Sequence, residues 1–540
     1  MYDVIVIGGG HAGSEAALAP ARLNKKTLLI TGNFKMIASM PCNPSIGGPA
    51  KGIVVREIDA LGGQMGRNTD KTHIQMRLLN ISKGPAVRAL RAQSDKVLYP
   101  KEMRNTIEKQ ENLEMMEAYV DRLIIENNTI KGVALENGDK IFGKSVIITT
   151  GTYMQSKILV GDQVTHMGPD DQKASEGLSP QLRELGFETI RLKTGTPPRV
   201  KTDSVDFSKT ELHAGDDVYR HFSFDNIDYL KLEDQWPCYL TYTNSDTHNI
   251  INMNLKKSSM YSGIVEGVGP RYCPSIEDKL VRFSDKERHQ IFLEPESKFI
   301  DEIYIQGFST SLPHDVQDEM IRTIPGLENA VIAKYAYAIE YDAIDPRVLY
   351  PTLESKTIHN LYFAGQVNGT SGYEEAACQG LMAGINASLK LEKKDPFILK
   401  RNEAYIGVLI DDLVTKGTKE PYRLLTSRSE YRLLLRHDNA DIRLRDYGHD
   451  IGLIEEERYS KYLAKLENIK NLKTKLHEFM LYPNVETNLI MQSFNSANLR
   501  EKISLYNILR RPEIKIRLLS KFIDLTAENL EKGCRFIIKL

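Results

Sequence analysis

The sequence predicts an α/β protein in which a Rossmann-like domain is interrupted by an inserted α+β domain and followed by an α-helical C-terminal domain. Three observations support this architecture. An apolar run at residues 2–7 leads directly into a glycine-rich loop, a similar run ending in glycine returns at residues 360–366, and helix-forming residues dominate beyond residue 396. A chain of 540 residues also exceeds one ordinary core, which favours several domains.

The N-terminal elements follow the order typical of a parallel sheet. We expect a buried strand at residues 2–7, a helix at residues 14–23 and a second strand at residues 26–30, which together form a βαβ unit. Further strands that complete this lobe are expected at residues 113–120, 133–135, 140–142 and 146–151.

The chain is then expected to divide into four parts. The region from about 200 to 340 is rich in Asp, Asn, Ser and Tyr, which indicates an inserted domain of mixed strand and loop. The later strand is followed by an expected helix at residues 373–391, so the Rossmann-like domain is predicted to be discontinuous. Its first part, the inserted domain, its second part and the helical domain are placed at residues 1–200, 201–339, 340–395 and 396–540.

Composition excludes several classes of protein. Hydrophobic residues make up 41% and charged residues 26%, and no stretch is long and apolar enough for a membrane span, so a soluble, cytoplasmic protein is expected. The net charge of −1 gives no general support for nucleic-acid binding. The five cysteines are far apart and include no CxxC pair, which argues against disulfides and against a metal site. They are Cys42, Cys238, Cys273, Cys378 and Cys534.

A glycine motif follows the first strand. Gly8-Gly9-Gly10-His11-Ala12-Gly13 fits the GxGxxG pattern of a dinucleotide-binding loop. In that pattern Gly8 permits the tight turn, Gly10 lets the backbone approach a pyrophosphate and Gly13 allows close helix packing. The alternative is a glycine-rich turn without a ligand. The acidic residue that usually ends the second strand is missing, because that strand ends Ile30-Thr31-Gly32-Asn33.

The distant second segment favours FAD over a nicotinamide dinucleotide. Gly365-Gln366 is followed by Gly372-Tyr373 and a helix rich in small residues, whose N-terminus would point at the flavin ring or the phosphates. A flavin dinucleotide needs to be held at its adenine end and at its isoalloxazine end, and the two glycine segments would each hold one of them. The alternative is a core helix that packs closely through its small residues.

Five motifs occur in order along the chain and point to one family. With these motifs the chain resembles the MnmG (GidA) family over roughly residues 1–520. The resemblance implies a flavoprotein fold of the glutathione-reductase type with a helical C-terminal domain. It also implies a homodimer that works with the GTPase MnmE as a heterotetramer of two dimers. The motifs are SMPCNPSIGG at residues 39–48, THIQ at 72–75, SKGPAVR at 82–88, GPRYCPSIEDK at 269–279 and EPYRLLTSRSEYR at 420–432.

The resemblance also implies an activity. It implies an FAD-dependent enzyme that adds a carboxymethylaminomethyl group to C5 of the wobble uridine of certain tRNAs, with NADH as transient reductant and methylenetetrahydrofolate as one-carbon donor. Two alternatives stay open, a folate- and FAD-dependent tRNA uracil-5-methyltransferase and a flavin-loaded, inert tRNA-binding scaffold. Family members continue in a further helical segment, so a chain ending at Leu540 is expected to be C-terminally shortened.

By resemblance, the cofactor contacts fall on particular residues of this chain. Val120 is expected to meet the adenine through its backbone, and Ser175 and Gln366 are expected to contact FAD. The FAD diphosphate is expected to contact Gly8, Gly9, Gly10, His11, Ala12 and Gly13. The NAD segment of the family corresponds to Gly269, Pro270, Arg271, Tyr272, Cys273, Pro274, Ser275, Ile276, Glu277, Asp278, Lys279, Leu280, Val281, Arg282 and Phe283. This stretch has no preceding strand and no GxGxxG pattern, so transient nicotinamide binding over the flavin is the alternative.

Cys42 and Cys273 lie inside family motifs and are the predicted catalytic residues. A thiolate can add to uracil C6 and make C5 nucleophilic, and a nearby cation lowers a thiol pKa. Arg271 and Lys51 are the neighbouring cations in the sequence. From spacing alone, the alternative is that either cysteine is a small buried hydrophobic residue, which is our interpretation of the other three cysteines.

Two basic clusters are predicted to bind tRNA. Arg428, Arg432 and Arg436 are spaced four residues apart, which predicts one face of a helix, and Arg423 belongs to the same motif. The alternative is a solvated helix face with internal ion pairs to Glu430 or Asp438. Tyr422 and Tyr431 would be available to stack on bases. The other cluster is a locally positive segment between Arg67 and Arg104, with Lys71, Arg77, Lys83, Arg88, Arg91, Lys96 and Lys101.

Overall fold

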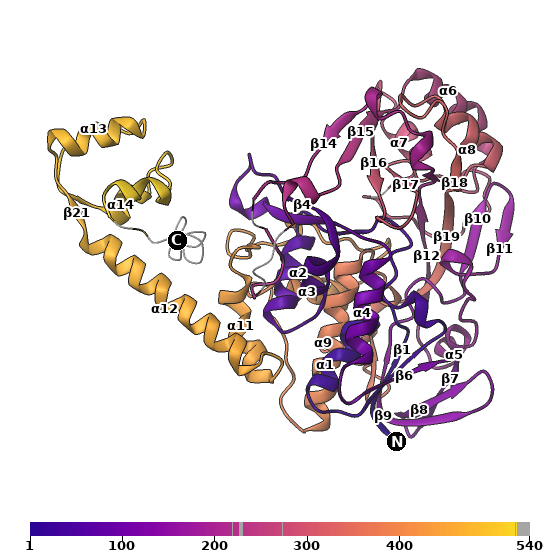
Figure 1. Ribbon diagram of the computed structural model, residues 1–540. Helices are drawn as coiled ribbons and strands as arrows, with labels where there is room; N and C mark the ends of the chain where they lie inside the picture. The colour runs from indigo at the N-terminus through magenta and orange to yellow at the C-terminus, as the bar shows by residue number, and fades with distance from the viewer. Residues whose placement is uncertain (219, 226–229, 273, 524, 526–540) are drawn as a thin grey trace.

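The computed structural model confirms the predicted fold class, an α/β domain with an inserted region and a helical C-terminal part (Figure 1). No helix among the described residues is long and apolar enough to cross a membrane. The structure describes residues 1–218, 220–225, 230–272, 274–523 and 525, so the predictions for Cys273 and Cys534 lie outside the described residues.

A seven-stranded sheet forms the centre of the molecule. β1 (Tyr2–Ile7) lies between β2 (Thr27–Thr31) and β9 (Lys140–Ile148) and pairs in parallel with both. The chain leaves β1 on one side for β2 and returns on the other side to β9. The carboxyl end of β1 is therefore a topological switch point, where open α/β sheets bind their ligands. The sheet is completed by β6 (Leu113–Glu117), β7 (Val120–Glu126), β8 (Thr129–Leu135) and, from much later in the chain, β20 (Leu361–Phe363).

Two helices pack together against this sheet. α1 (His11–Arg22) begins directly after the glycine loop, and α9 (Tyr373–Leu391) has the bounds that the sequence predicts. A Cβ atom at Gly380 would lie 2.0 Å from the carbonyl oxygen of Ala12, so only glycine allows the two helices to approach this closely. The small residues of α9 thus serve packing, while its first turn borders the cavity described below.

Two long strands connect the central sheet with the inserted region. β12 (Thr189–Thr196) and β19 (Tyr337–Ile344) pair antiparallel along their whole length, in a four-stranded sheet with β10 (Lys157–Val160) and β11 (Gln163–Thr165). The inserted region adds a six-stranded antiparallel sheet with its own hydrophobic core. Its strands are, in order, β14 (Glu211–His213), β15 (Cys238–Tyr242), β16 (Gln290–Pro295), β17 (Ile303–Gln306), β13 (Arg199–Val200) and β18 (Ile332–Lys334), and α6 (Ser245–Asn254), α7 (Ile276–Arg282) and α8 (His314–Ile321) belong to the same region.

A small antiparallel sheet faces the inserted region. It has the order β3-β5-β4, and the side-chain amide of Gln75, on β4, donates to the carbonyl oxygens of His213 and Trp236, each at 3.0 Å. The bounds of the strands are β3 (Ser45–Gly47), β4 (His73–Leu79) and β5 (Ala89–Ser94), and the helices near them are α2 (Lys51–Ala60), α3 (Met65–Thr72), α4 (Leu98–Glu108) and α5 (Leu178–Glu184).

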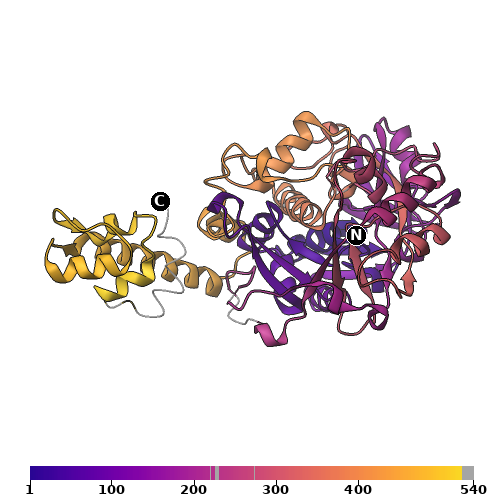
Figure 2. The same ribbon diagram turned by 90° about the horizontal axis from the view of Figure 1, so that it is seen from above.

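The C-terminal helices form two groups. α10 (Tyr405–Lys416) and α11 (Ala440–Ile451) contribute to the main hydrophobic core, which extends to Leu453. α12 (Glu456–Glu478) projects away from the body, as Figures 1 and 2 show, and a separate core that begins at Leu472 lies at its tip. The tip contains β21 (Met480–Leu481), α13 (Val485–Ser493), β22 (Ile503–Ser504) and α14 (Leu505–Leu509).

Buried ion pairs lie where the arm meets the body. Arg445, on α11, pairs with Asp59 of α2 at 3.5 Å and with Asp225 at 3.0 Å. Arg458, on α12, pairs with Asp225 at 2.7 Å. The Arg445 and Asp59 side chains are at most 1% exposed, so removing one partner would leave an uncompensated buried charge.

The prediction of one helix that carries the three arginines is wrong. Arg428, Arg432 and Arg436 lie in a short 3-10 helix (Thr426–Arg428) and the turns after it, and the next α-helix begins at Ala440. Local hydrogen bonds to the backbone compete with the helix here: Arg428 Nε donates to the carbonyl oxygen of Arg423, and the Asn439 side chain accepts from the Arg436 N–H. The spacing of four residues therefore does not place these arginines on one helix face.

Candidate functional site

A cavity of about 1010 Å³ opens at the carboxyl end of β1. Its walls come from the glycine loop after β1, from the first turn of α9, from the loop that carries Cys42 and from the inserted region. Its position at the switch point of the sheet is where this architecture binds a dinucleotide.

The glycine loop has the geometry that its sequence predicts. Gly8 has a φ of +104°, and a Cβ there would lie 2.6 Å from the carbonyl oxygen of Thr149, so this turn requires glycine. A Cβ at Gly13 would lie 1.8 Å from the carbonyl oxygen of Gly8, which makes Gly13 a packing position. A Cβ at Gly10 meets no protein atom within 4 Å, which leaves room for a ligand at that point.

The structure brings most of the predicted FAD contacts together. Of the motif, five residues line the cavity, and Gly13 is not among them. The cavity is also lined by residues that the sequence analysis did not assign to FAD. Three of them are the last residue of β2 and the two residues after it, which is the one signal for them, and Lys173 has no such signal. The predicted residues that line the cavity are Gly8, Gly9, Gly10, His11, Ala12, Val120, Ser175 and Gln366, and the added ones are Thr31, Gly32, Asn33 and Lys173.

A buried cation lies beside the first turn of α9. Lys51 Nζ pairs with Glu374 Oε2 at 3.0 Å and with Glu375 Oε2 at 3.2 Å, directly below the N-terminus of α9. Burial alone would lower the Lys51 pKa, but the two carboxylates outweigh it and raise that pKa above its ordinary value. The lysine is therefore charged at neutral pH. The sequence analysis had considered it only as a neighbour of Cys42.

His11 is the one aromatic residue of the glycine motif. Its ring lies between those of Tyr373 and Tyr99, with centroid distances of 4.5 and 5.6 Å. Burial lowers its pKa to about 4, so the imidazole is neutral at pH 7. This packing supports the first turn of α1 behind the cavity, and we assign His11 no proton-transfer role.

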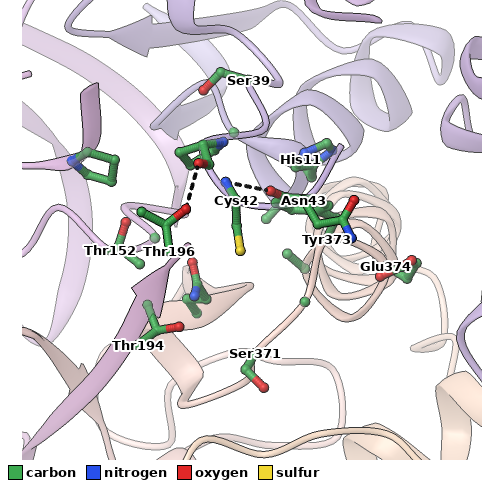
Figure 3. A pocket seen from close by; sticks show the side chains of 18 of the residues that line it. His11, Ser39, Cys42, Asn43, Thr152, Thr194, Thr196, Ser371, Tyr373 and Glu374 are labelled. Carbon is green, nitrogen blue, oxygen red and sulfur yellow. Dashed lines mark hydrogen bonds between the residues drawn. The ribbon is translucent and has the colours of Figure 1, made fainter. Parts of the chain in front are cut away.

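Cys42 faces the cavity beside α9. Its Sγ lies 3.1 Å from the hydroxyl oxygen of Tyr304, and its backbone N–H donates to the hydroxyl of Tyr373 at 3.2 Å. Figure 3 shows the thiol pointing into the space between Thr194, on β12, and Ser371, before α9. A half-buried thiol in a cavity wall can meet a substrate, unlike the fully buried Cys378.

The stretch predicted to bind NAD divides into a cavity part and a packing part. Pro270 and Tyr272 line the large cavity, whereas Ser275 borders a small neighbouring pocket and caps α7. Ile276 and Leu280 of α7 are buried in the core of the inserted region. The helix therefore has a clear packing function. The NAD assignment itself stays a prediction.

The four predicted tRNA-binding arginines lie in different surroundings. Arg423 borders the cavity, where its Nη1 donates to the carbonyl oxygen of Tyr272 at 3.1 Å. Arg428 stacks over the ring of the buried Tyr422 at 4.1 Å, so this tyrosine is not free to stack on a base. The other two arginines also differ in their surroundings. Arg432 is exposed, and Arg436 forms a 2.9 Å ion pair with Asp438.

The end of the cavity that faces the inserted region is polar. Asn43, next to Cys42, donates through Nδ2 to Glu294 at 2.6 Å and to Gln306 at 3.2 Å. Within the described ranges, no group of three or more His, Cys, Asp or Glu side chains is arranged to hold a metal ion. The other residues at this end are Gln75, Arg77, Arg91, His213, Cys238 and Phe292.

Comparisons with known proteins agree with this geometry. The family described as "Glucose inhibited division protein A" matches residues 3–395, and the "tRNA modifying enzyme MnmG/GidA C-terminal helical domain" matches residues 456–534. The structure of Aquifex aeolicus GidA in its form II crystal superposes with a TM-score of 0.92 at 45% identity, over 99% of this chain and 86% of that one.

Curated relatives are similar over nearly the whole chain. The "tRNA uridine 5-carboxymethylaminomethyl modification enzyme MnmG" of Bacillus subtilis (strain 168) is 59% identical over 520 residues, which cover 96% of this chain and 82% of the relative. The protein of the same name from Acholeplasma laidlawii (strain PG-8A) is 58% identical, over 97% of this chain and 85% of the relative. Together with the family match, these similarities show that the chain belongs to the MnmG/GidA family of tRNA-modifying enzymes.

Proposed function

We propose that this chain is an FAD-dependent enzyme that installs a carboxymethylaminomethyl group at C5 of the wobble uridine of certain tRNAs. The observation that supports this most is the meeting of the glycine loop, the N-terminus of α9 and the Cys42 thiol in one cavity. Relatives that are 58% and 59% identical carry this activity in their names.

The residues at the glycine-loop end fit FAD. The space beside Gly10 would take the diphosphate at the N-terminus of α1, with Val120, Ser175 and Gln366 as further contacts. The N-terminus of α9 would stabilise negative charge on the ring system by about 0.3–1 kcal/mol. When bound, FAD supplies the redox chemistry; NADH as transient reductant and methylenetetrahydrofolate as one-carbon donor belong to the same proposal.

Cys42 would act on the uracil itself. Its thiolate would form a bond to C6, and the electron pair of the C5–C6 double bond would make C5 nucleophilic. Loss of the C5 proton and of the thiolate would later restore the double bond. By resemblance, Cys273 takes part in the same chemistry.

The helical region from residue 396 would bind tRNA and the GTPase MnmE, in a homodimer that assembles with an MnmE dimer in the cytoplasm. The projecting α12 arm, with its separate core, offers a surface away from the cavity for such contacts. Mixing the chain with MnmE and measuring the mass of the complex by light scattering would test the heterotetramer.

The exposed Arg432 and the paired Arg436 should differ in their effects on tRNA binding. Each phosphate contact that Arg432→Ala removes should lower the slope of log affinity against log salt by about 0.7–0.9, because fewer counterions are released. Arg436→Ala should change the slope little, since its guanidinium already pairs with Asp438 at 2.9 Å. Titration of tRNA at several salt concentrations measures both. An unchanged slope for Arg432→Ala would shift attention to the cations between Arg67 and Arg104.

Nucleoside analysis separates the proposed activity from its two rivals. tRNA from cells with and without this chain would be digested and its uridines measured by mass spectrometry. A chain-dependent carboxymethylaminomethyluridine supports the proposal. A chain-dependent 5-methyluridine would indicate the folate-dependent methyltransferase, and tRNA binding without any modified uridine would indicate an inert scaffold.

A further inference from the structure

Two arginines lie opposite each other at the polar end of the cavity. Arg77, on β4, and Arg91, on β5, are direct partners in the antiparallel register, so they are on the same face of the small sheet. Both line the cavity. Like charges directly opposite each other destabilise a sheet unless other groups compensate them.

Of these two arginines, only Arg91 has its positive charge balanced by a carboxylate of the protein. Its Nη2 pairs with Glu294 Oε1 at 2.6 Å, and the Glu294 side chain is only 3% exposed. Arg77 instead donates from Nη1 to Nδ1 of His213 at 2.9 Å. Burial and the neighbouring Arg77 both lower the pKa of His213, so this ring is a neutral acceptor at pH 7. Across the described part of the chain, no carboxylate forms an ion pair with Arg77, so the positive charge of Arg77 is uncompensated at this end of the cavity.

The position of this charge relates it to the proposed chemistry. Glu294 holds both Arg91 and the Asn43 amide, and Asn43 directly follows Cys42 in the chain. Arg77 is therefore at the same end of the cavity as the proposed nucleophile. Among the described residues, no member of the glycine loop forms a hydrogen bond or ion pair with Arg77, Arg91 or Glu294, so we do not assign this cluster to the FAD diphosphate.

We propose that Arg77 binds the carboxylate of the small amine that supplies the carboxymethylamino part of the modification. This inference rests on the proposed function. The group in question ends in –NH–CH2–COO⁻, which is glycine joined through its nitrogen. A planar guanidinium binds a carboxylate through two parallel hydrogen bonds, and the bond to His213 fixes the orientation of the Arg77 side chain. Amines without a carboxylate would not need this residue.

The test compares two amines on one variant. Arg77→Gln would be assayed with tRNA and MnmE, with glycine or ammonium as amine, and both carboxymethylaminomethyluridine and aminomethyluridine would be measured. We expect the KM for glycine to rise roughly 10- to 100-fold, the usual effect of losing a charge-assisted hydrogen bond. The KM for ammonium should stay unchanged. Arg77→Lys keeps the positive charge, so its KM for glycine should lie between those of the unaltered protein and Arg77→Gln.

Each outcome has a distinct meaning. An unchanged KM for glycine, or equal losses with both amines, would overturn the proposal, and a raised KM for tRNA alone would assign Arg77 to a backbone phosphate instead. Arg322→Gln, at the residue directly after α8, is the control for the loss of one positive charge. Flavin absorbance and thermal unfolding report on folding; removing one of two opposed arginines should not lower the melting temperature. If the unaltered protein formed neither product, the proposed function would fail rather than the role of Arg77.

Discussion

Replacing Cys42 with serine should leave the flavin bound and reduce uridine modification by roughly three orders of magnitude or more, because a hydroxyl is a much weaker nucleophile than a thiolate. The substitution preserves the size of the side chain and the contact with the hydroxyl of Tyr304. Single-turnover formation of the modified uridine, with the visible flavin spectrum recorded on the same sample, measures both parts. Cys273→Ser is expected to behave in the same way.

Cys238 provides a matched control in the same cavity. Burial raises the pKa of its thiol to about 12, so it is a thiol rather than a thiolate at neutral pH. Cys238→Ser should therefore keep most of the activity. If Cys42→Ser modified tRNA at the normal rate, covalent catalysis by this residue would be excluded.

Gly10→Val should abolish flavin binding without unfolding the protein. A Cβ at Gly10 contacts no protein atom within 4 Å and φ there is −70°, so the folded chain tolerates a side chain. The added atoms would occupy the space where the backbone must approach the diphosphate. The purified variant should be colourless and have an unchanged far-ultraviolet circular dichroism spectrum.

Gly84→Val is the control for replacing a glycine residue by valine outside the cavity. A Cβ at Gly84 also has no neighbour within 4 Å, and its φ is −64°, but this residue does not line the cavity. Gly84→Val should stay yellow. A folded Gly10→Val protein with stoichiometric flavin would remove the basis for the nucleotide-site assignment.

The sequence predicts the parts of the fold and site that depend on local patterns. The run from residue 2 to Gly13 combines a buried strand, a tight turn and a helix start, and each part is specified by neighbouring residues. Likewise, the small residues of α9 and the glycine before it predict the helix with its observed bounds. Pairing in the central sheet then brings the two glycine segments to one edge.

Contacts between distant segments could not be predicted in this way. The segment from Arg67 to Arg104 is locally positive in the sequence, yet Arg91 pairs with Glu294 and Lys96 with Glu296, about 200 residues later. A local charge count cannot include those carboxylates. It therefore overestimates the free positive charge of the segment, and it does not distinguish Arg77, which has no carboxylate partner among the described residues, from the paired Arg91.

The prediction of a helix that carries Arg428, Arg432 and Arg436 was wrong for a different reason. A spacing of four residues predicts a helix face only if the backbone is helical. Here the side chains of Arg428 and Asn439 bond to the backbone and favour turns. The same side-chain types and spacing are compatible with both structures, so periodicity alone could not decide between them.

The ion pairs at the base of α12 hold the direction of the C-terminal arm, and a small rotation there would move its tip a long way. With 23 residues at 1.5 Å each, α12 is about 34 Å long, so a rotation of about 10° at its base would move the tip by about 6 Å. At its base, Arg458 of α12 forms ion pairs with Asp225 at 2.7 Å and with Asp59 at 3.8 Å. Because those pairs are largely buried, salt screens them weakly, and the arm should keep its direction over a wide range of ionic strength.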